Sequence, residues 1–216
     1  AFHEQFKADA AIMAKMAPGT QLVFLYLYYA ENTGSVNLTQ IAKALSLSKA
    51  TCTRAINDLS ASGLISQTAE GTNKWITTAY TKSELLEKAY GRLKTPVDRI
   101  LYVKGTAQIE HPIASGIRAL ARQSMIGVND QDGAIAISKK EAAKIPAEDI
   151  CTKQYFEDFG GAVIEVWSYD PIILERDGCV DDISLLLSMD NDPNERVQTC
   201  LDEIRQKHGL PIKEEE

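Results

Sequence analysis

The side chains best suited to bind another molecule lie in the segment SKATCTRAIND, residues 48–58. Apolar residues recur there at spacings of three and four, at Cys52, Ala55, Ile56 and Leu59, so they share one face of a helix. The opposite face carries two cations and short hydrogen-bonding side chains, and its first carboxylate is Asp58. That face comprises Lys49, Ala50, Thr51, Thr53, Arg54 and Asn57. This pattern indicates close approach to a negatively charged surface that offers hydrogen bonds.

The major groove of B-DNA is such a surface, because it is about 12 Å wide and distinguishes base pairs by their donors and acceptors. We expect Arg54 to bind guanine and Asn57 to bind adenine, each through two hydrogen bonds. Ser48 and the free amides at the helix start suit a phosphate, because the positive end of the helix dipole lies there. The residues predicted to bind DNA are Thr39, Ser48, Lys49, Thr51, Thr53, Arg54, Asn57, Thr72, Asn73 and Lys74.

Three helices and a hairpin are expected to position these residues. A buried helix begins near Pro18, with Gly34 beyond its end, and a second helix follows Asn37 or Thr39 as its cap. Ser48 is the expected cap of the third helix, which ends at Gly63. Two strands flank EGTN, residues 70–73, whose composition is typical of a hairpin turn. A helix at 83–93 then leads away.

This order of elements, over Val36–Thr78, resembles the winged helix-turn-helix of MarR-like transcriptional regulators. The resemblance rests on LTQIAKALSLSKATCTRAINDLSASGLI and the following EGTN wing, about a fifth of the chain. It implies that Lys49–Ser62 is the recognition helix and that double-stranded DNA is the partner. Some winged helices bind protein instead, and that alternative stays open. The family's dimer arrangement cannot be transferred, because a long, acidic region follows.

The second half mixes strands and helices and predicts a separate α+β domain. Thr95-Pro96 is the expected linker, because a residue before proline resists helix formation. The expected organisation is therefore a DNA-binding domain at 1–94 and an effector, dimerisation or partner-binding domain at 95–216. Expected strands lie at 99–105, 133–138 and 161–169. Expected helices lie at 112–126, 138–145, 181–189 and 194–209.

Charge is unevenly distributed along the chain. The whole chain has a net charge of −7, but residues 37–80 carry four basic and two acidic side chains. Residues 141–216 carry seven basic and 19 acidic ones. A polyanion can therefore approach the middle of the chain while the acidic end points elsewhere.

Several acids in the second domain raise the alternative of a metal-dependent nuclease. They are Glu165, Asp170, Glu175, Asp177, Asp181 and Asp182. A nuclease site needs two or three of them to converge, usually beside a lysine. The strand sequence EVW has no lysine two places after the glutamate, so solvated acids and helix caps are the favoured interpretation. His111 has no nucleophile or carboxylate at motif spacing, and the four cysteines lack zinc-site spacing.

The segment EVWSYDPIILERDGCVDDISLLLSMDNDPNERVQTCLDEI weakly resembles the C-terminal portion of winged-helix antitoxins from abortive-infection, type IV toxin–antitoxin systems. That resemblance implies a protein-interaction module, in which an acidic domain binds a protein partner. It is the alternative to regulation through DNA alone.

The sequence thus predicts a cytoplasmic transcriptional regulator, acting as a repressor and as a homodimer, with no catalytic residues, metal or cofactor. No bilayer-spanning segment is visible, because the longest apolar run, at 22–30, is too short. A small-molecule effector or a protein partner is assigned to the C-terminal domain. Trp75, Trp167 and the tyrosines at 26, 28 and 29 are expected in the core.

Overall fold

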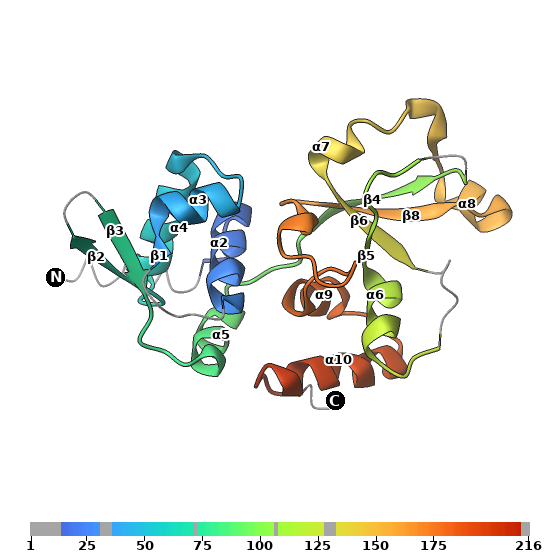
Figure 1. Ribbon diagram of the computed structural model, residues 1–216. Helices are drawn as coiled ribbons and strands as arrows, with labels where there is room; N and C mark the ends of the chain where they lie inside the picture. Colours follow the sequence, from blue (N-terminus) through green and yellow to red (C-terminus); the bar gives the residue numbers. More distant parts are fainter. Residues whose placement is uncertain (1–13, 31–35, 71–72, 106–107, 128–132, 213–216) are drawn as a thin grey trace. The chain divides into compact units, whose positions relative to one another are not determined.

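The computed structural model describes residues 14–30, 36–70, 73–105, 108–127 and 133–212. The chain forms two compact units (Figure 1). The N-terminal unit comprises Ala1–Lys94 together with His208–Leu210. The C-terminal unit comprises Thr95–Lys207 and Pro211–Glu216. Both combine helices with β-sheet, so the fold class is α+β.

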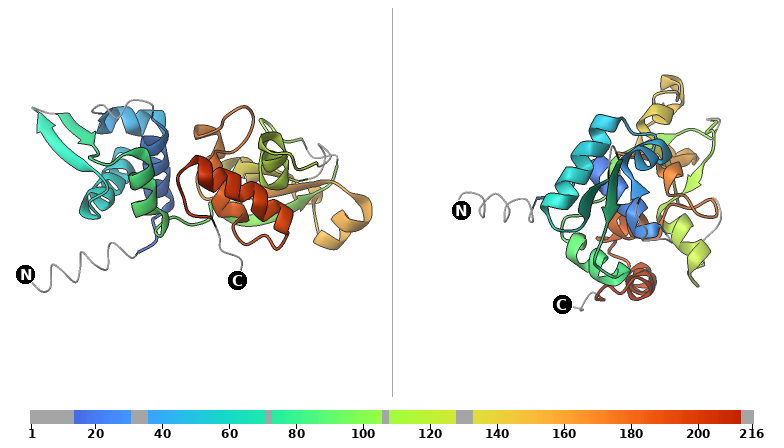
Figure 2. Two further views of the ribbon diagram at one scale, coloured as in Figure 1. Left: turned by 90° about the horizontal axis from the view of Figure 1, so that it is seen from below. Right: turned by 60° about the vertical axis from the view of Figure 1, so that its left-hand side comes forward.

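In the described part of the N-terminal unit, helices α2 to α5 pack against a small antiparallel sheet with strand order β1-β3-β2. Strands β2 and β3 run side by side next to helices α3 and α4 (Figure 2). In chain order the elements are α2 (Pro18–Tyr29), β1 (Val36–Asn37), α3 (Leu38–Ala44), α4 (Lys49–Ala61), β2 (Ser66–Glu70), β3 (Asn73–Thr77) and α5 (Lys82–Tyr90).

Local capping determines where the helices of this unit begin. The side chain of Asn37 accepts a hydrogen bond from the Gln40 amide at 2.8 Å, and the Gln40 side chain accepts one from the Asn37 amide at 3.1 Å. This capping box shows that Asn37, not Thr39, is the cap of α3. Ser48 caps α4 as expected, and Gly63 follows the helix with φ +73°.

The core of the N-terminal unit lies between α2 and the helix pair α3–α4. Phe24 and Leu25 of α2 are buried with Ile41 of α3 and with Ile56 and Leu59 of α4. The buried residues of α4 are Cys52, Ala55, Ile56 and Leu59, the four apolar positions that the spacing in this helix predicted. Burial of this stripe fixes which side of α4 remains exposed.

The C-terminal unit is built on a five-stranded sheet with strand order β5-β6-β8-β4-β7. Strands β6 and β8 are parallel, and the other neighbours are antiparallel. Its elements are β4 (Val97–Val103), β5 (Ile113–Ala114), α6 (Gly116–Gln123), β6 (Ala134–Ser138), α7 (Lys139–Ala142), η1 (Ala147–Asp149), β7 (Ile150–Cys151), α8 (Lys153–Phe159), β8 (Ala162–Trp167), η2 (Pro171–Ile173), α9 (Asp182–Met189) and α10 (Glu195–Lys207).

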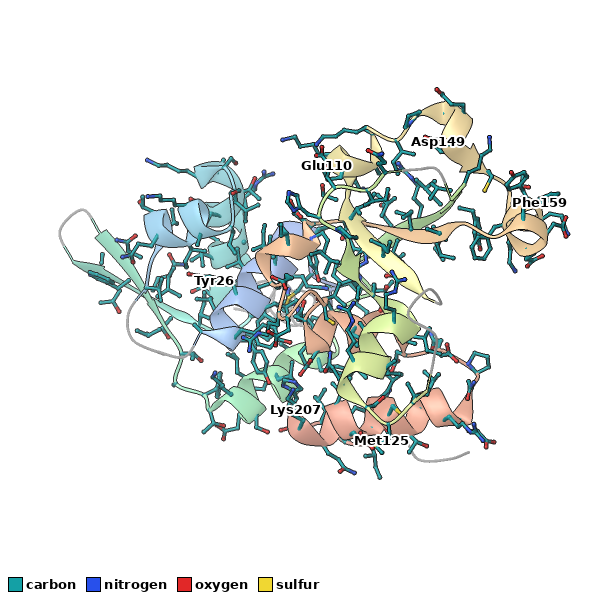
Figure 3. All side chains as sticks on the ribbon, turned by 45° about the vertical axis from the view of Figure 1, so that its right-hand side comes forward. Tyr26, Glu110, Met125, Asp149, Phe159 and Lys207 are labelled. Atoms are coloured by element: carbon teal, nitrogen blue, oxygen red, sulfur yellow. The ribbon has the colours of Figure 1, made fainter. Side chains whose placement is uncertain are left out.

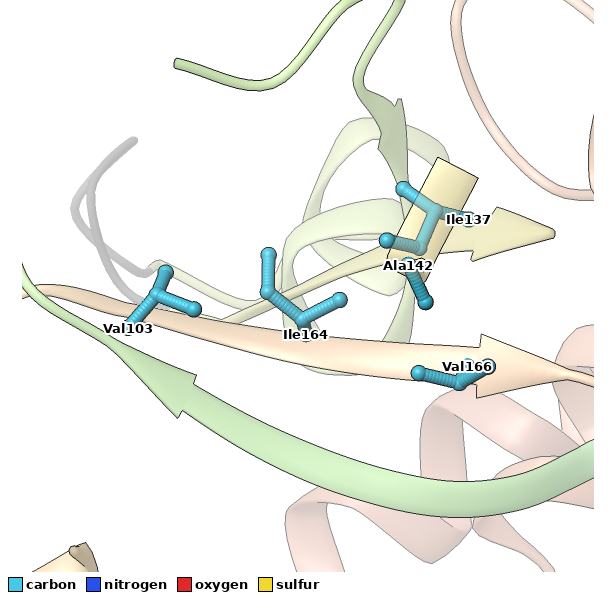
Figure 4. Close-up of a cluster of buried hydrophobic side chains, with 5 residues drawn as sticks. All are labelled: Val103, Ile137, Ala142, Ile164 and Val166. Atoms are coloured by element: carbon cyan, nitrogen blue, oxygen red, sulfur yellow. The ribbon is translucent and has the colours of Figure 1, made fainter. Parts of the chain in front are cut away.

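Helices cover the two faces of this sheet unequally. Helices α6, α9 and α10 lie on one side, while the short helix α7 lies on the other (Figure 1). On the α7 side, Val103, Ile137, Ala142, Ile164 and Val166 form a buried apolar cluster (Figure 4). The alternate positions of β8 turn toward the larger helices, where Trp167 is buried.

Two expectations for the C-terminal unit were wrong in their boundaries, and two of its elements were not predicted. The helix predicted at 112–126 is confined to Gly116–Gln123, because Ile113 and Ala114 pair with β6 instead. The helix predicted at 138–145 ends at Ala142. Strand β7 and helix α8 were not expected at all. None of the helices in the described ranges has the length and apolar character to cross a bilayer.

Candidate nucleic-acid interface

Helix α4 presents its polar face to solvent. Lys49, Arg54 and Asn57 are exposed, whereas the four apolar positions of the same helix are buried. Thr39, at the start of α3, is also exposed. The structure therefore brings the two cations and the amide of α4 onto one surface, with Thr39 on the preceding helix.

The polar side chains at the start of α4 already form hydrogen bonds within the helix, which the sequence pattern did not indicate. The Ser48 hydroxyl lies 2.9 Å from the Thr51 hydroxyl and accepts a hydrogen bond from the Thr51 amide at 3.1 Å. Thr51 is half-buried, and its methyl group would lie 2.9 Å from a Cβ placed on Gly19 of α2. Thr53 is half-buried as well. Of these three, Ser48 alone is exposed.

The wing lies beside the far end of α4. The Gln67 side chain of β2 donates a hydrogen bond to the side-chain oxygen Oδ1 of Asn57 at 3.4 Å, so helix and hairpin touch at the predicted reading position. Glu70 pairs with Asn73 where the hairpin closes. Asn73 and Lys74 lie in β3, and Thr72 lies outside the described residues.

The one carboxylate of α4 is neutralised within the unit. One terminal nitrogen of Arg92 lies 3.0 and 3.1 Å from the two Asp58 oxygens. The Arg92 side chain is buried, and its Nε also donates to the Ala14 carbonyl at 2.9 Å. Because this cation cancels the Asp58 charge, Lys49 and Arg54 decide the electrostatic sign of the helix.

A frame of hydrogen bonds holds Arg92 in place. The buried Gln21 side chain donates to the Lys94 carbonyl at 2.8 Å and accepts from the Lys94 amide at 3.0 Å. The Met16 amide donates to the Arg92 carbonyl at 2.8 Å. Sequence reasoning missed Arg92, Gln21 and Gln67. A single carboxylate on a helix, such as Asp58, suggests a cationic partner, but the spacing of residues in the sequence does not identify Arg92 as that partner.

Three of the acids that raised the nuclease alternative, Glu165, Asp170 and Asp181, have local structural partners. Glu165 is buried and accepts hydrogen bonds from the Ser115 hydroxyl at 2.6 Å and the Trp167 indole at 3.0 Å. Asp181 caps α9, and Asp170 caps the turn η2. Among the residues the structure describes, no three histidine, cysteine or acidic side chains are arranged to hold a metal. Asp170 and Asp181 are thus caps, in line with the favoured interpretation, whereas Glu165 is a buried, hydrogen-bonded side chain and not the solvated acid that was expected.

The remaining candidates from the sequence also lie in structural settings. Trp167 and Tyr28 are buried as expected, whereas Tyr26, Tyr29 and Trp75 are half-buried, so two of the five aromatic residues expected in the core are fully buried. His111 is exposed. All four cysteines are free thiols, and burial raises the pKa of the Cys52 thiol, which disfavours its reactive thiolate form.

Helices α2, α3 and α4, the short strand β1 and the hairpin of β2 and β3 together define a winged helix-turn-helix unit. Residues 20–74 match the model of the MarR family, which confirms the resemblance on which the N-terminal prediction rests. The match implies a DNA-binding transcriptional regulator. Proteins of this family bind DNA, typically act as dimers, and are regulators, not enzymes.

The other comparisons give no match, either with curated proteins or with solved structures. The weak resemblance of the C-terminal segment to antitoxins is therefore not confirmed.

Proposed function

We propose that the protein is a sequence-specific repressor that reads the major groove with α4 and contacts the adjoining backbone with its wing. The observation that carries the proposal is the exposed face of α4, where Lys49, Arg54 and Asn57 lie together and Asp58 is neutralised by Arg92. Cations attract the phosphates, while the guanidinium and the amide match the edges of guanine and adenine.

The proposed mechanism is occupancy without chemistry. Phosphate contacts release counterions and make the affinity depend on salt, while base contacts supply the preference for one operator. A single winged helix contacts few base pairs, so we propose a homodimer that binds a palindromic site. Dimerisation and any effector response are assigned to the C-terminal unit in this proposal.

The experiment that tests the proposal is selection of bound duplexes from a random pool, followed by titration of the selected site. Arg54→Ala should lower affinity for that site by about tenfold and relax the preference at one base pair. Lys74→Ala should weaken binding to all sequences and reduce the salt slope by about one. Lys82→Ala serves as the matched control, because Lys82 is an exposed cation on α5.

Each outcome of this experiment either supports or contradicts the reading of bases by α4. Enrichment of a palindrome, lost with Arg54→Ala and kept with Lys82→Ala, supports a dimeric regulator that reads sequence. If no motif is enriched, or if Arg54→Ala binds like the unchanged protein, helix α4 does not read bases.

A second candidate function, docking of a protein partner on the C-terminal unit, is favoured by one observation. The rings of Tyr155 and Phe159 lie with their centroids 4.8 Å apart and their planes tilted by 40°, and Phe159 is 73% exposed. Exposed aromatic side chains are characteristic of interface centres. Glu157 and Asp158 adjoin them and would suit a basic partner. Cross-linking of cell extract to wild-type protein and to Phe159→Ser tests this, since a specific partner should be lost only with the variant.

A further inference from the structure

The hairpin of β2 and β3 projects from the helices of the N-terminal unit (Figure 3), and one of its side chains turns back toward α4. Gln67 of β2 lies directly opposite Ile76 of β3, which is 3% exposed. Side chains at directly opposite positions of an antiparallel pair share one face of the sheet, so Gln67 lies on the buried face. The other described side chains of β2, at 66, 68 and 69, are exposed, whereas Gln67 is half-buried.

The hydrogen-bonding partner of Gln67 is Asn57, on the exposed face of α4. Nε2 of Gln67 donates to Oδ1 of Asn57 at 3.4 Å. At this length the hydrogen bond orients the amide more than it stabilises the fold. None of the described residues accepts a hydrogen bond from Nδ2 of Asn57, so that group can donate to a molecule outside the chain. Asn57 follows Arg54 by three positions, so the two side chains are neighbours on one helix face.

The orientation of this amide matters for recognition, because an asparagine side chain carries a donor at one end and an acceptor at the other. Rotation of the group by half a turn exchanges the two ends. A donor placed beside one end selects the arrangement with Oδ1 toward the wing and Nδ2 away from it. Adenine is read by an amide that donates to N7 and accepts from the N6 amino group. Oδ1 has two lone pairs, so it can accept from Gln67 and from N6 together.

We propose that Gln67 determines base specificity by orienting the Asn57 amide, without contacting a base itself. This inference rests on the proposed reading of DNA by α4. In the free protein the hydrogen bond selects one amide arrangement, so the entropic cost of ordering that side chain is met before a duplex binds. Gln67 is thus a positioning residue, and the preference for adenine opposite Asn57 depends on it.

The orientation of the amide is measured first in the free, full-length protein by NMR. Gln67→Met keeps the length of the side chain and removes the donor, so the side-chain amide resonances of Asn57 should shift. Thr68→Val is the matched control, because Thr68 is the exposed next residue of the same strand and pairs with Trp75 on the other face. It should leave those resonances in place, and neither variant should lower the melting temperature appreciably. Unchanged Asn57 resonances in Gln67→Met would overturn the proposal.

A double-mutant cycle on the selected duplex then tests the effect on base reading. Asn57→Ala identifies the base pair whose preference depends on this residue. Gln67→Met should relax the preference at the same base pair and lower affinity for the selected duplex by about three- to fivefold, the typical weight of one hydrogen bond. In the Asn57→Ala background, Gln67→Met should cause no further loss, because the residue through which it acts is gone. The salt slope should stay the same, because no charge is removed.

The outcomes of the cycle separate this inference from the proposed function. If Asn57→Ala relaxes one base pair and Gln67→Met does not, Gln67 does not orient the reading amide, while reading by α4 stands. Losses that add in the double variant would mean that Gln67 contacts DNA itself, which contradicts the proposal. A Thr68→Val variant that relaxes the same base pair would contradict it as well. If Asn57→Ala leaves every base preference unchanged, reading by Asn57 fails together with this inference.

Discussion

Helices α4 and α10 have the same length, 13 residues, and bury one apolar face each, but their exposed faces differ in kind. Helix α4 carries Lys49, Arg54 and Asp58 as its charged residues. Helix α10 carries acids and bases along its whole length, from Glu195 to Lys207. The opposite charges on α10 can pair with one another and with water. The exposed face of α4 has cations without a matching number of carboxylates, so it can donate hydrogen bonds to a partner.

Each helix is anchored by a buried arginine, and the place of that arginine in the chain explains why the exposed faces differ in charge. In the C-terminal unit Arg205 belongs to α10 itself and bonds Asp190 at 2.6 Å and Asp202 at 2.5 Å. In the N-terminal unit Arg92 lies beyond α5 and reaches across to Asp58. The carboxylate of Asp58 is thus neutralised by a residue outside α4, so Lys49 and Arg54 of α4 are not needed for that purpose.

The largest expected effect comes from removing the anchor of α10. Arg205→Ala should destabilise the C-terminal unit by about 3 kcal/mol, because Asp190 and Asp202 lose their shared, buried cation. The chain has two tryptophans, so a Trp75→Phe background leaves Trp167 as the fluorescent reporter of this unit during urea unfolding. Arg196→Ala, at an exposed position of the same helix, should change little. Equal effects of the two variants would show that Arg205 is not an anchor.

The same chemical change on the two helices should have unequal effects on DNA binding. Asn57→Asp places a carboxylate on the exposed face of α4 and should reduce affinity by about 2 kcal/mol, through repulsion of phosphates and loss of an amide donor. Gln206→Glu makes the corresponding change at an exposed position of α10 and should have no effect. Fluorescence anisotropy with the selected duplex measures both. Similar losses for the two variants would remove the distinction drawn between these helices.

The role of Arg92 can be isolated by removing the charge of its partner. Asp58→Asn leaves the buried guanidinium without a carboxylate and should destabilise the N-terminal unit by about 1–2 kcal/mol. The effect is smaller than that of Arg205→Ala, because Asp58 is 35% exposed in its side chain. Hydrogen exchange of the α4 amides measures it directly. Unchanged exchange rates would mean that the ion pair does not hold the helix.

The smallest effect concerns the cap of α5. The hydrogen bond from the Thr81 amide lowers the pKa of Glu84 below its ordinary value of 4.5. A carboxyl group with a lowered pKa contributes stability above its ordinary pKa, and that contribution is lost as the pH falls through the lowered value. Glu84→Gln should therefore lower the melting temperature slightly at neutral pH and not at strongly acidic pH. Glu87→Gln on the same helix is the control, and a difference that persists in acid would contradict the assignment.

The sequence predicted well those helix caps and buried helix faces that depend on residues close together in the chain. The caps Asn37 and Ser48 and the buried stripe of α4 follow from spacings of a few residues, which periodicity and capping rules describe. The family match over 20–74 covers the same region. The reading residues themselves stay a prediction, because their partner is a duplex.

Features that depend on distant partners could not be predicted in the same way. Ile150 and Cys151 become a strand because they pair with Val103 and Tyr102, far away in the chain. The partner of Asp58 is 34 residues further on, and no local rule selects Arg92 over other cations.

The close approach of Gly19 to Thr51 restricts how such a regulator could evolve. A Cβ at position 19 would lie 2.9 Å from the Thr51 methyl group, so the two sites must remain small together. Gly19 also forgoes the better helix propensity of alanine, by about 0.5–1 kcal/mol, in exchange for this contact. Under the proposed reading of DNA by α4, operator preference would therefore change more readily through the exposed residues Arg54 and Asn57 than through the half-buried Thr51. Substitutions at positions 19 and 51 are therefore expected to be coupled.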